Sequence, residues 1–291
     1  MALCDACQGS CQSAASSAAP AWKLVNWQVD VSMLSGALGG PLVVGLLTPQ
    51  RNAMTLAAKD VMSTYGGLYR QVFARGLMGG FRGMSKPMMA AVPQFTAVGP
   101  VYLAAERKLG STSLAIFGAA VAESLCTFSA QSRNAQIQFN ATRTSVAEQV
   151  AVTSMRNLMG PGFVAHVARN IVAMTGIRLF SPHSLQVVRR IPGASQLSEE
   201  SQHVAADFAS SCVAATLSMP FNHVFSWASC TPELKSMGYL ARARASASFL
   251  VDNYRDQGIR LLGRDLAVRI SYTGLLFTLY RGVERQLEGR Q

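Results

Sequence analysis

Long apolar runs without a single charged residue dominate the pattern of this 291-residue chain. Three of them cover residues 31–50, 87–105 and 208–232. A helix needs about 20 mostly apolar residues to cross a bilayer core, because lipid offers no partner to backbone N–H and C=O groups. Runs of this length predict helices that cross a membrane rather than core helices of a soluble protein.

Three apolar segments end in a similar pattern of residues, which indicates an internal repeat. In each, a proline or serine stands nine residues after a small residue: Gly40 and Pro49, Ala120 and Ser129, Ser211 and Pro220. Small residues let membrane helices approach each other closely, and a proline near the end of such a helix bends it. We therefore expect closely packed helices with bends at the two prolines.

Each of these segments is followed by a polar stretch, a turn marked by glycine and a second long helix. The second helices are expected to end near an aromatic residue or a histidine, at Tyr102, His183 and Tyr280. Three units of two helices predict an all-α membrane protein with six transmembrane helices in three pseudo-repeats. The chain then divides into an N-terminal tail and three units: 1–29, 30–110, 111–195 and 196–291.

In the order and spacing of these features the chain resembles the mitochondrial carrier family over about residues 30–287. The resemblance rests on short sequences at matching places in the units: Thr48-Pro49, Met219-Pro220, Gln138, Ala74-Arg75-Gly76, Gly80-Phe81-Arg82-Gly83, Pro93, residues 258–263, and Tyr280 with Glu284. It implies six tilted helices around a pseudo-threefold axis, with short helices on the matrix side. Both termini would then face the intermembrane space.

The resemblance also implies a ring of ion pairs at the matrix side, built from a Pro-x-Asp/Glu-x-x-Lys/Arg motif in each unit. Opposite charges three residues apart share one helix face, so that neighbouring helices can be linked. Other residues stand at the acidic and basic positions of this chain: Arg51 and Met54, Gln131 and Asn134, Asn222 and Phe225. We therefore expect a degenerate matrix gate in which the ring of ion pairs cannot form.

The ring at the opposite side would come from an aromatic-Asp/Glu-x-x-Lys/Arg motif. Glu106 stands where the first unit should have a base, and the second unit has neither charge after His183. The third unit has Arg281 and Glu284 in swapped order, which allows a pair within one helix. We expect a degenerate outer gate, and the loss of both rings argues against a function that needs opening and closing.

The family's substrate site lies midway along the second helix of each unit, which places it near Val98 in the first unit and Gly176 in the second. Arg269 is the one charged residue among these positions. An ionisable residue inside a membrane helix is costly and marks a functional site by default. The alternative is that the arginines of these helices lie near the interfaces or pair with Asp265: Arg169, Arg178, Arg264 and Arg269.

The charge balance is strongly basic, with 26 Lys and Arg against 15 Asp and Glu and a formal net charge of +11. The basic residues stand as singles and pairs at the ends of apolar runs rather than in one block. That distribution suits snorkelling side chains and anionic headgroups, such as those of cardiolipin, better than a nucleic-acid groove. We expect the lipid bilayer as a partner and no nucleic acid.

Residues that bind metals or catalyse reactions do not form a familiar pattern in this sequence. Cys4, Cys7 and Cys11 form a C-x2-C-x3-C sequence, but a fourth ligand is missing nearby, and chance cysteines in a polar tail are the alternative. The histidines are spread over different units: His166, His183, His203 and His223. We expect no metal, no cofactor and no enzyme activity.

These patterns together predict a multi-pass protein of the mitochondrial inner membrane. Because both rings of charges are lost, the leading hypothesis is a carrier-derived protein that no longer transports. It would serve as an accessory or structural subunit of a respiratory-chain or ATP synthase assembly, beside other inner-membrane subunits. One alternative is an active, divergent carrier that exchanges a small anionic metabolite. Another is a carrier-like scaffold in the outer membrane.

Overall fold

A computed structural model describes residues 35–57, 63–141, 149–154 and 156–288 of the chain. Every regular element in these ranges is a helix, which confirms the all-α prediction. The N-terminal cysteines of the C-x2-C-x3-C sequence lie outside the described residues.

Three of the described helices are long and apolar enough to cross a membrane: α6 (Ser85–Leu109), α7 (Thr112–Ala141) and α10 (Glu199–Ser229). They indicate a membrane protein and agree with the predicted runs at 87–105 and 208–232. Helix α7 contains no long uncharged run, because Glu123 and Arg133 interrupt its apolar sequence. The finer prediction of six spans stays a prediction.

The first apolar run, for which we expected one helix with a bend at Pro49, is interrupted before that proline. It is divided into a π-helix η1 (Ser35–Gly39), α2 (Gly40–Leu46) and α3 (Thr48–Ala57). The break falls at Leu47, whose φ and ψ are −90° and 14°. Pro49 accounts for the break, because it has no N–H to donate to the carbonyl four residues before it. By contrast, α10 continues without a break through Pro220.

Two further long segments are composite. Helix α8 (Phe163–Thr175) continues through a π-helix η3 (Gly176–Phe180) into α9 (Ser181–Arg190). Helix α11 (Tyr239–Glu288) is two helices joined at Gly258, where φ is 70° and ψ is 178°. A positive φ of this size is readily adopted only by glycine, so the predicted glycine-marked turn is found here.

The second helix of each unit is longer than the sequence indicated. Helix α6 continues past Tyr102 to Leu109, where Gly110 ends it in the left-handed conformation with φ of 60°. Helix α9 continues past His183 to Arg190, and α11 continues past Tyr280. The aromatic and histidine positions therefore lie inside these helices rather than at their ends.

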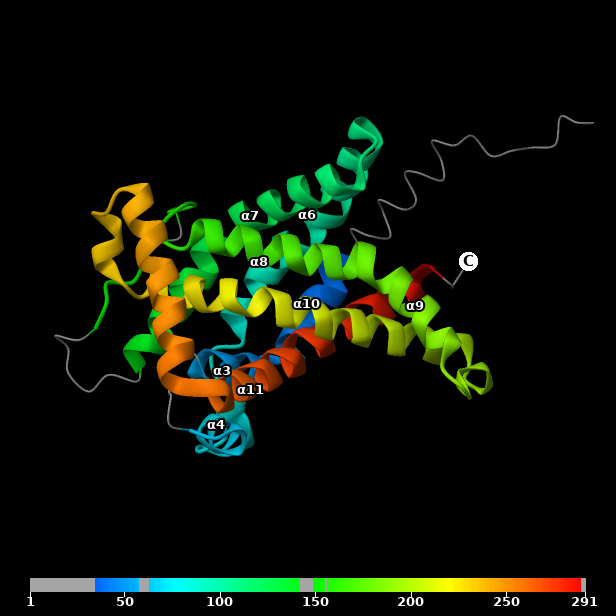
Figure 1. Cartoon of the computed structure of the whole chain (residues 1–291), viewed down its shortest axis with the longest axis horizontal. Coiled ribbons are helices and arrows are strands. Elements are labelled where there is room, and N and C mark those ends of the chain that lie inside the picture. The colour runs from blue at the N-terminus through cyan, green and yellow to red at the C-terminus, as the bar shows by residue number, and fades with distance from the viewer. Residues whose placement is uncertain (1–34, 58–62, 142–148, 155, 289–291) are drawn as a thin grey trace, which may run out of the picture.

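The helical segments pack in chain order into a closed ring. Helix α2 packs on α6, α6 on α7, α7 on α8, and both α8 and α9 on α10. Helix α11 packs on α10 and returns to α3 and η1, which closes the ring. Figure 1 shows α8, α10 and α11 side by side along the long axis of the molecule.

Small residues bring the first helices together, as predicted. A Cβ atom added at Gly40 would lie 2.6 Å from the Phe95 ring, and one at Gly36 would lie 2.2 Å from the carbonyl oxygen of Phe95. Ala120 is fully buried on α7, and Ser211 is buried on α10. Close helix approach therefore depends on these small side chains.

The two ends of the ring differ in structure. One end, called the α4 end, carries the short helices: α4 (Tyr65–Val72), α5 (Leu77–Gly80), η5 (Pro232–Lys235) and the part of α11 before Gly258. The other, called the α9 end, carries the end of α9, the short 3-10 helix η4 (Ala194–Gln196) and the turn at Gly110. A Cβ atom at Gly39 would lie 2.8 Å from Val283, so both described chain ends meet at the α9 end.

Candidate functional site: an arginine-lined cavity

A cavity of about 120 Å³ lies inside the ring of helices. Residues of α2, α3, α6, α7, α8, η3 and α11 line it. Its charged lining residues comprise four arginines and one glutamate: Arg51, Arg169, Arg178, Arg269 and Glu123. The cavity is therefore strongly basic, although it lies among apolar helices.

Arg169 on α8 is buried and donates hydrogen bonds only to neutral side chains among the described residues. Its Nε and Nη2 donate to Asn170 Oδ1 at 3.2 and 3.0 Å. Nη2 also donates to Gln131 Oε1 on α7 at 3.1 Å, and Nη1 donates to Asn222 Oδ1 on α10 at 3.3 Å. No described carboxylate lies within ion-pair distance of this guanidinium group.

Arg269 on α11 reaches the same acceptor from the other side. Its Nη1 donates to Asn222 Oδ1 at 3.3 Å and contacts Met54 Sδ at 3.3 Å, and its Nη2 donates to Ser218 Oγ at 3.2 Å. Its buried Nε has no hydrogen-bond partner among the described residues. Two buried cations thus share one neutral acceptor, Asn222 Oδ1. Their like charges repel each other strongly, because the surroundings are apolar.

The other two arginines extend the basic lining along the cavity. Arg51 lines it from α3. Arg178 lines it from η3, where its guanidinium carbon lies 4.6 Å from the centre of the Tyr102 ring, and its buried Nε has no partner. A cation over an aromatic face is stabilised by about 1 kcal/mol, which is less than a carboxylate provides in an apolar site.

Most of the predicted matrix-gate positions meet around this pair of arginines. Met54, Gln131 and Asn222 are hydrogen-bond acceptors for Arg169 or Arg269, and Arg51 lines the same cavity. Asn134 lies half-buried on α7. The gate positions are therefore joined by hydrogen bonds from arginines to neutral acceptors. The arginines lie on α8 and α11, helices that the motif does not include.

Phe225, the last gate position, belongs to an aromatic cluster at the same level. Its ring centre lies 4.8 Å from that of His166 and 6.0 Å from that of Phe128. The Arg169 guanidinium carbon lies 5.4 Å from the Phe225 ring centre. Aromatic packing thus occupies the place where the family motif would have a base.

Of the predicted outer-gate residues, Glu106 lies in contacts of its own helix hairpin. Glu106 accepts hydrogen bonds from the Tyr102 hydroxyl at 2.7 Å and from Thr112 Oγ1 at 3.1 Å, both within the α6–α7 hairpin. Arg281 is half-buried on α11, and the side chain of Glu284 lies outside the described part. The expected pair within α11 therefore stays a prediction.

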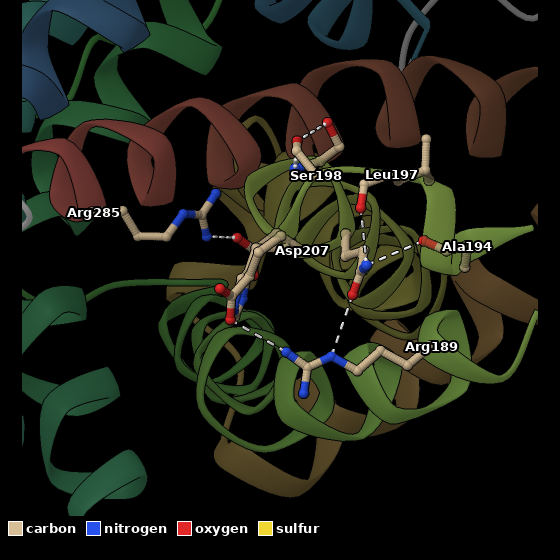
Figure 2. Close-up of polar contacts among 10 residues, drawn as sticks. Arg189, Ala194, Leu197, Ser198, Asp207 and Arg285 are labelled. Carbon is tan, nitrogen blue, oxygen red and sulfur yellow. Dashed lines mark hydrogen bonds and ion pairs between the residues drawn. The ribbon is translucent and has the colours of Figure 1, made fainter.

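An ion pair that the sequence analysis missed joins three helices at the α9 end. Buried Asp207 on α10 pairs through Oδ2 with Arg285 Nη1 on α11, and its Oδ1 accepts a hydrogen bond from Ser181 Oγ on α9 at 2.5 Å. Figure 2 shows the side chains of Asp207 and Arg285 directed toward each other. The available signal was a lone acidic residue at the start of the run 208–232, since such residues are costly in a membrane unless paired.

A second polar group at this end fixes the turn between α9 and α10. Arg189 Nε donates to Gln202 Oε1 at 3.3 Å, and Gln202 Nε2 donates to the carbonyl oxygens of Ala194 and Leu197 at 3.1 Å. These bonds tie the turn to the first part of α10 (Figure 2). They are exposed and belong to the support of the helix ends rather than to the cavity.

The three predicted substrate-binding residues are placed differently by the fold. Val98 and Arg269 line the cavity. Gly176 instead faces α10, where a Cβ atom would lie 2.5 Å from the Ala214 methyl group. It therefore serves close packing between η3 and α10.

The sequence left open whether one of four arginines pairs with Asp265, and among the described contacts Arg264 does so. Its Nη2 lies 2.7 Å from Asp265 Oδ1 and also donates to the Ala57 carbonyl oxygen at 2.7 Å. Its Nη1 donates to the Ser63 carbonyl oxygen at 2.7 Å, so that α11 is tied to the end of α3. Asp265 Oδ2 lies 3.5 Å from His223 Nε2 on α10.

Tyr254, which lies before the Gly258 break, completes this group at the α4 end. Its ring stacks on that of His223, with 5.8 Å between the ring centres. Burial, and secondly the nearby Asp265 charge, raises the pKa of Tyr254 to about 12, so its hydroxyl stays protonated. Every charge in this group has an opposite charge or a hydrogen-bond partner close by.

Neither the family models nor the curated proteins compared with this chain match it. Within the described residues, no group of three or more His, Cys, Asp or Glu side chains is placed to hold a metal ion. The cavity must therefore be interpreted from its own lining, in which four arginines stand against one glutamate.

Proposed function

We propose that this protein is a carrier-like, multi-pass protein of the mitochondrial inner membrane that binds a small anionic metabolite in its cavity and exchanges it across the bilayer. The observation that carries the proposal is the pair of buried arginines, Arg169 and Arg269, on one neutral oxygen of Asn222. This reverses the order of the two leading hypotheses formed from the sequence.

The physical reason is the cost of buried charge. Taking an ion out of water costs several kcal/mol even after relaxation, and neutral acceptors return only part of it. A purely structural core gains stability when such groups are replaced by apolar residues of similar size. An anion between the two guanidinium groups would instead accept short charge-assisted hydrogen bonds, and the planar donors of arginine suit carboxylate and phosphate groups.

The architecture supports a carrier-like fold with six spans. The ring closes through segments of all three predicted units, and both described chain ends meet at the α9 end, as an even number of spans requires. The cavity lies at the centre of the ring, where the resemblance to mitochondrial carriers puts the substrate. These features support the family assignment that the motifs had suggested.

The charge distribution supports an orientation with the α4 end in the matrix. Residues 63–84, 149–162 and 230–257 at that end contain eight Lys or Arg against three Asp or Glu. The turns at the α9 end, 106–112 and 181–203, contain four against three. Basic residues are enriched in the loops on the inner side of a membrane, which for the mitochondrial inner membrane is the matrix side. They also attract anionic lipids such as cardiolipin.

The experiment is uptake of labelled anions by liposomes that contain the purified full-length protein. We expect saturable uptake of a dicarboxylate or an organic phosphate, stimulated by unlabelled anion inside. Arg169→Gln should abolish it, whereas Arg107→Gln at the exposed end of α6 serves as the control and should leave it unchanged. Absence of saturable uptake for every anion tested would overturn the proposal.

A second candidate is the accessory subunit of a respiratory-chain or ATP synthase assembly. It is favoured by the neutral residues at the gate positions and by apolar side chains that are exposed at the α4 end. Leu77, Met78, Tyr239 and Leu240 are 73%, 82%, 73% and 76% exposed, although they lie outside the candidate spans. Native electrophoresis of mild detergent extracts would distinguish the two, since a subunit migrates with its complex and a carrier of 31.1 kDa migrates alone.

A further inference from the structure

Glu123 is a carboxyl group in an unusual place. It lies in the middle of the apolar helix α7, is only 9% exposed and faces the cavity. Its Oε1 accepts a hydrogen bond of 2.5 Å from Gln94 Nε2 on α6. Among the described residues that line the cavity it is the only acid, and no described basic group lies within ion-pair distance of it.

The charges that share the cavity with Glu123 come from four of the segments that line it, α3, α8, η3 and α11. Arg169 faces it from α8 and is its principal positive neighbour. Arg51 on α3, Arg178 on η3 and Arg269 on α11 line the same space, and the other titratable lining residues are Tyr272 and Tyr280 on α11. Helix α6 contributes only the neutral Gln94 amide.

The charge of Glu123 is therefore controlled by what occupies the cavity. In the empty cavity Arg169 stabilises the carboxylate against the cost of its burial, because an opposite charge nearby favours the ionised form. An anion bound to the arginines cancels that positive field and repels the carboxylate, which then gains by taking up a proton. Linkage is reciprocal, so a proton on Glu123 also strengthens anion binding.

We propose that Glu123 is a proton-binding residue, so that the cavity takes up one proton with each anion and releases both together. The proton comes from water as the carboxylate becomes a carboxyl group, and it returns to water when the anion leaves. No other bond forms or breaks. This inference rests on the proposed function, because it requires an anion in the cavity, and it makes the transported species an anion with its proton.

The test is calorimetric titration of the full-length protein in detergent with two probes, sulfate and ethane-1,2-disulfonate. Both keep their charge between about pH 6 and about pH 8, a range in which a perturbed carboxyl group titrates. Measurement in two buffers of different ionisation enthalpy gives the number of protons taken up. For the wild type we expect about one proton per anion and an affinity that falls by up to about tenfold for each unit of rising pH.

Glu123→Gln should bind the probe without proton uptake, with an affinity near the wild-type value at low pH and independent of pH. Glu200→Gln, at the exposed start of α10, is the matched control and should behave as the wild type. Gln94→Leu keeps the carboxyl group but removes the bond that favours its charged form. It should move the fall in affinity to higher pH, which tests the inference even where Glu123→Gln does not fold.

Unchanged proton uptake in Glu123→Gln, or no proton uptake by the wild type, would overturn this inference and leave anion binding intact. If the wild type binds neither probe at any pH, the proposed function and the proton site are both wrong. The two failures are therefore distinguishable.

Discussion

Arg264 and Arg269 lie five residues apart on α11, are almost equally buried, and differ in their partners. Arg264 has the carboxylate of Asp265 and two backbone carbonyl groups, which use its donors in a compact group at the α4 end. Arg269 has only neutral acceptors, one of them shared with Arg169, and an unpartnered Nε. The first arrangement is complete within the chain, whereas the second has room for an external negative charge.

This difference separates a structural charge from a binding charge in the same helix. Breaking a complete buried pair leaves an uncompensated charge and costs stability. Removing a charge that was never compensated relieves repulsion, and only ligand binding suffers. The comparison therefore predicts opposite consequences for the same substitution at two neighbouring positions.

The largest effect is expected for Arg264→Met. It leaves Asp265 buried without its guanidinium partner and removes the hydrogen bonds to the carbonyl groups of Ala57, at the end of α3, and Ser63, just before α4. The free energy of unfolding should fall by about 3–5 kcal/mol, as for other broken buried pairs. Thermal unfolding of the detergent-solubilised protein measures it. An unchanged midpoint would show that this cluster is not the complete structural unit described above.

Arg269→Met should do the reverse. Stability should change by less than about 1 kcal/mol or increase, because an uncompensated charge is replaced by an apolar side chain of similar length. Affinity for sulfate should fall by about 100-fold, through loss of a charge-assisted hydrogen bond to the anion. The same unfolding assay and calorimetric titration check both parts. A destabilisation as large as that of Arg264→Met would remove the distinction between the two arginines.

Asp207→Asn tests a third arginine, Arg285, which resembles Arg264 because its partner lies within the chain. The side chain of Arg285 is 23% exposed, so that water can compensate part of the loss. We expect a destabilisation of about 1–2 kcal/mol, less than for a fully buried pair, with unchanged sulfate affinity. A loss of affinity would show that this pair takes part in binding.

The smallest change is expected for Asn222→Asp, which gives Arg269 and Arg169 the carboxylate that Arg264 already has. The new charge should raise the unfolding midpoint and compete with the external anion, so that sulfate affinity falls by about tenfold. Asn222→Ser, which keeps a neutral acceptor, is the control. An affinity equal to that of the wild type would mean that the anion binds elsewhere.

The helical pattern was predictable from the sequence, whereas among the polar contacts only a pair with Asp265 had been considered, and Arg264 forms it. Apolar runs and small residues indicated α6, α10 and the close contact at Gly40, since hydrophobicity and size act locally along a helix. The break at Leu47 was missed because a proline in a membrane helix is compatible with either a bend or a break. The helix is interrupted at Leu47, about one turn before residue 50, where the predicted apolar run ends.

The sequence identified only part of the candidate site, because the contacts within the site join helices that are far apart along the chain. Arg269 was identified because a lone charge in an apolar helix is conspicuous, and the gate residues were identified by their spacing. That Arg169 shares an acceptor with Arg269 depends on the meeting of α8, α10 and α11, which lie far apart along the chain. The roles of Glu123 and Asp207 depend in the same way on partners from other helices.

Closure of the ring by α11 has a consequence for how the protein is made. In the six-span arrangement that we propose, Arg169 would enter the membrane with α8, before Asn222 on α10 and Arg269 on α11. A nascent chain that stops before α11 has a ring with an open side, through which lipid reaches the arginine. An incomplete chain would therefore expose a buried charge that only the last helix covers, because α11 contacts α10, α3 and η1 and closes the ring.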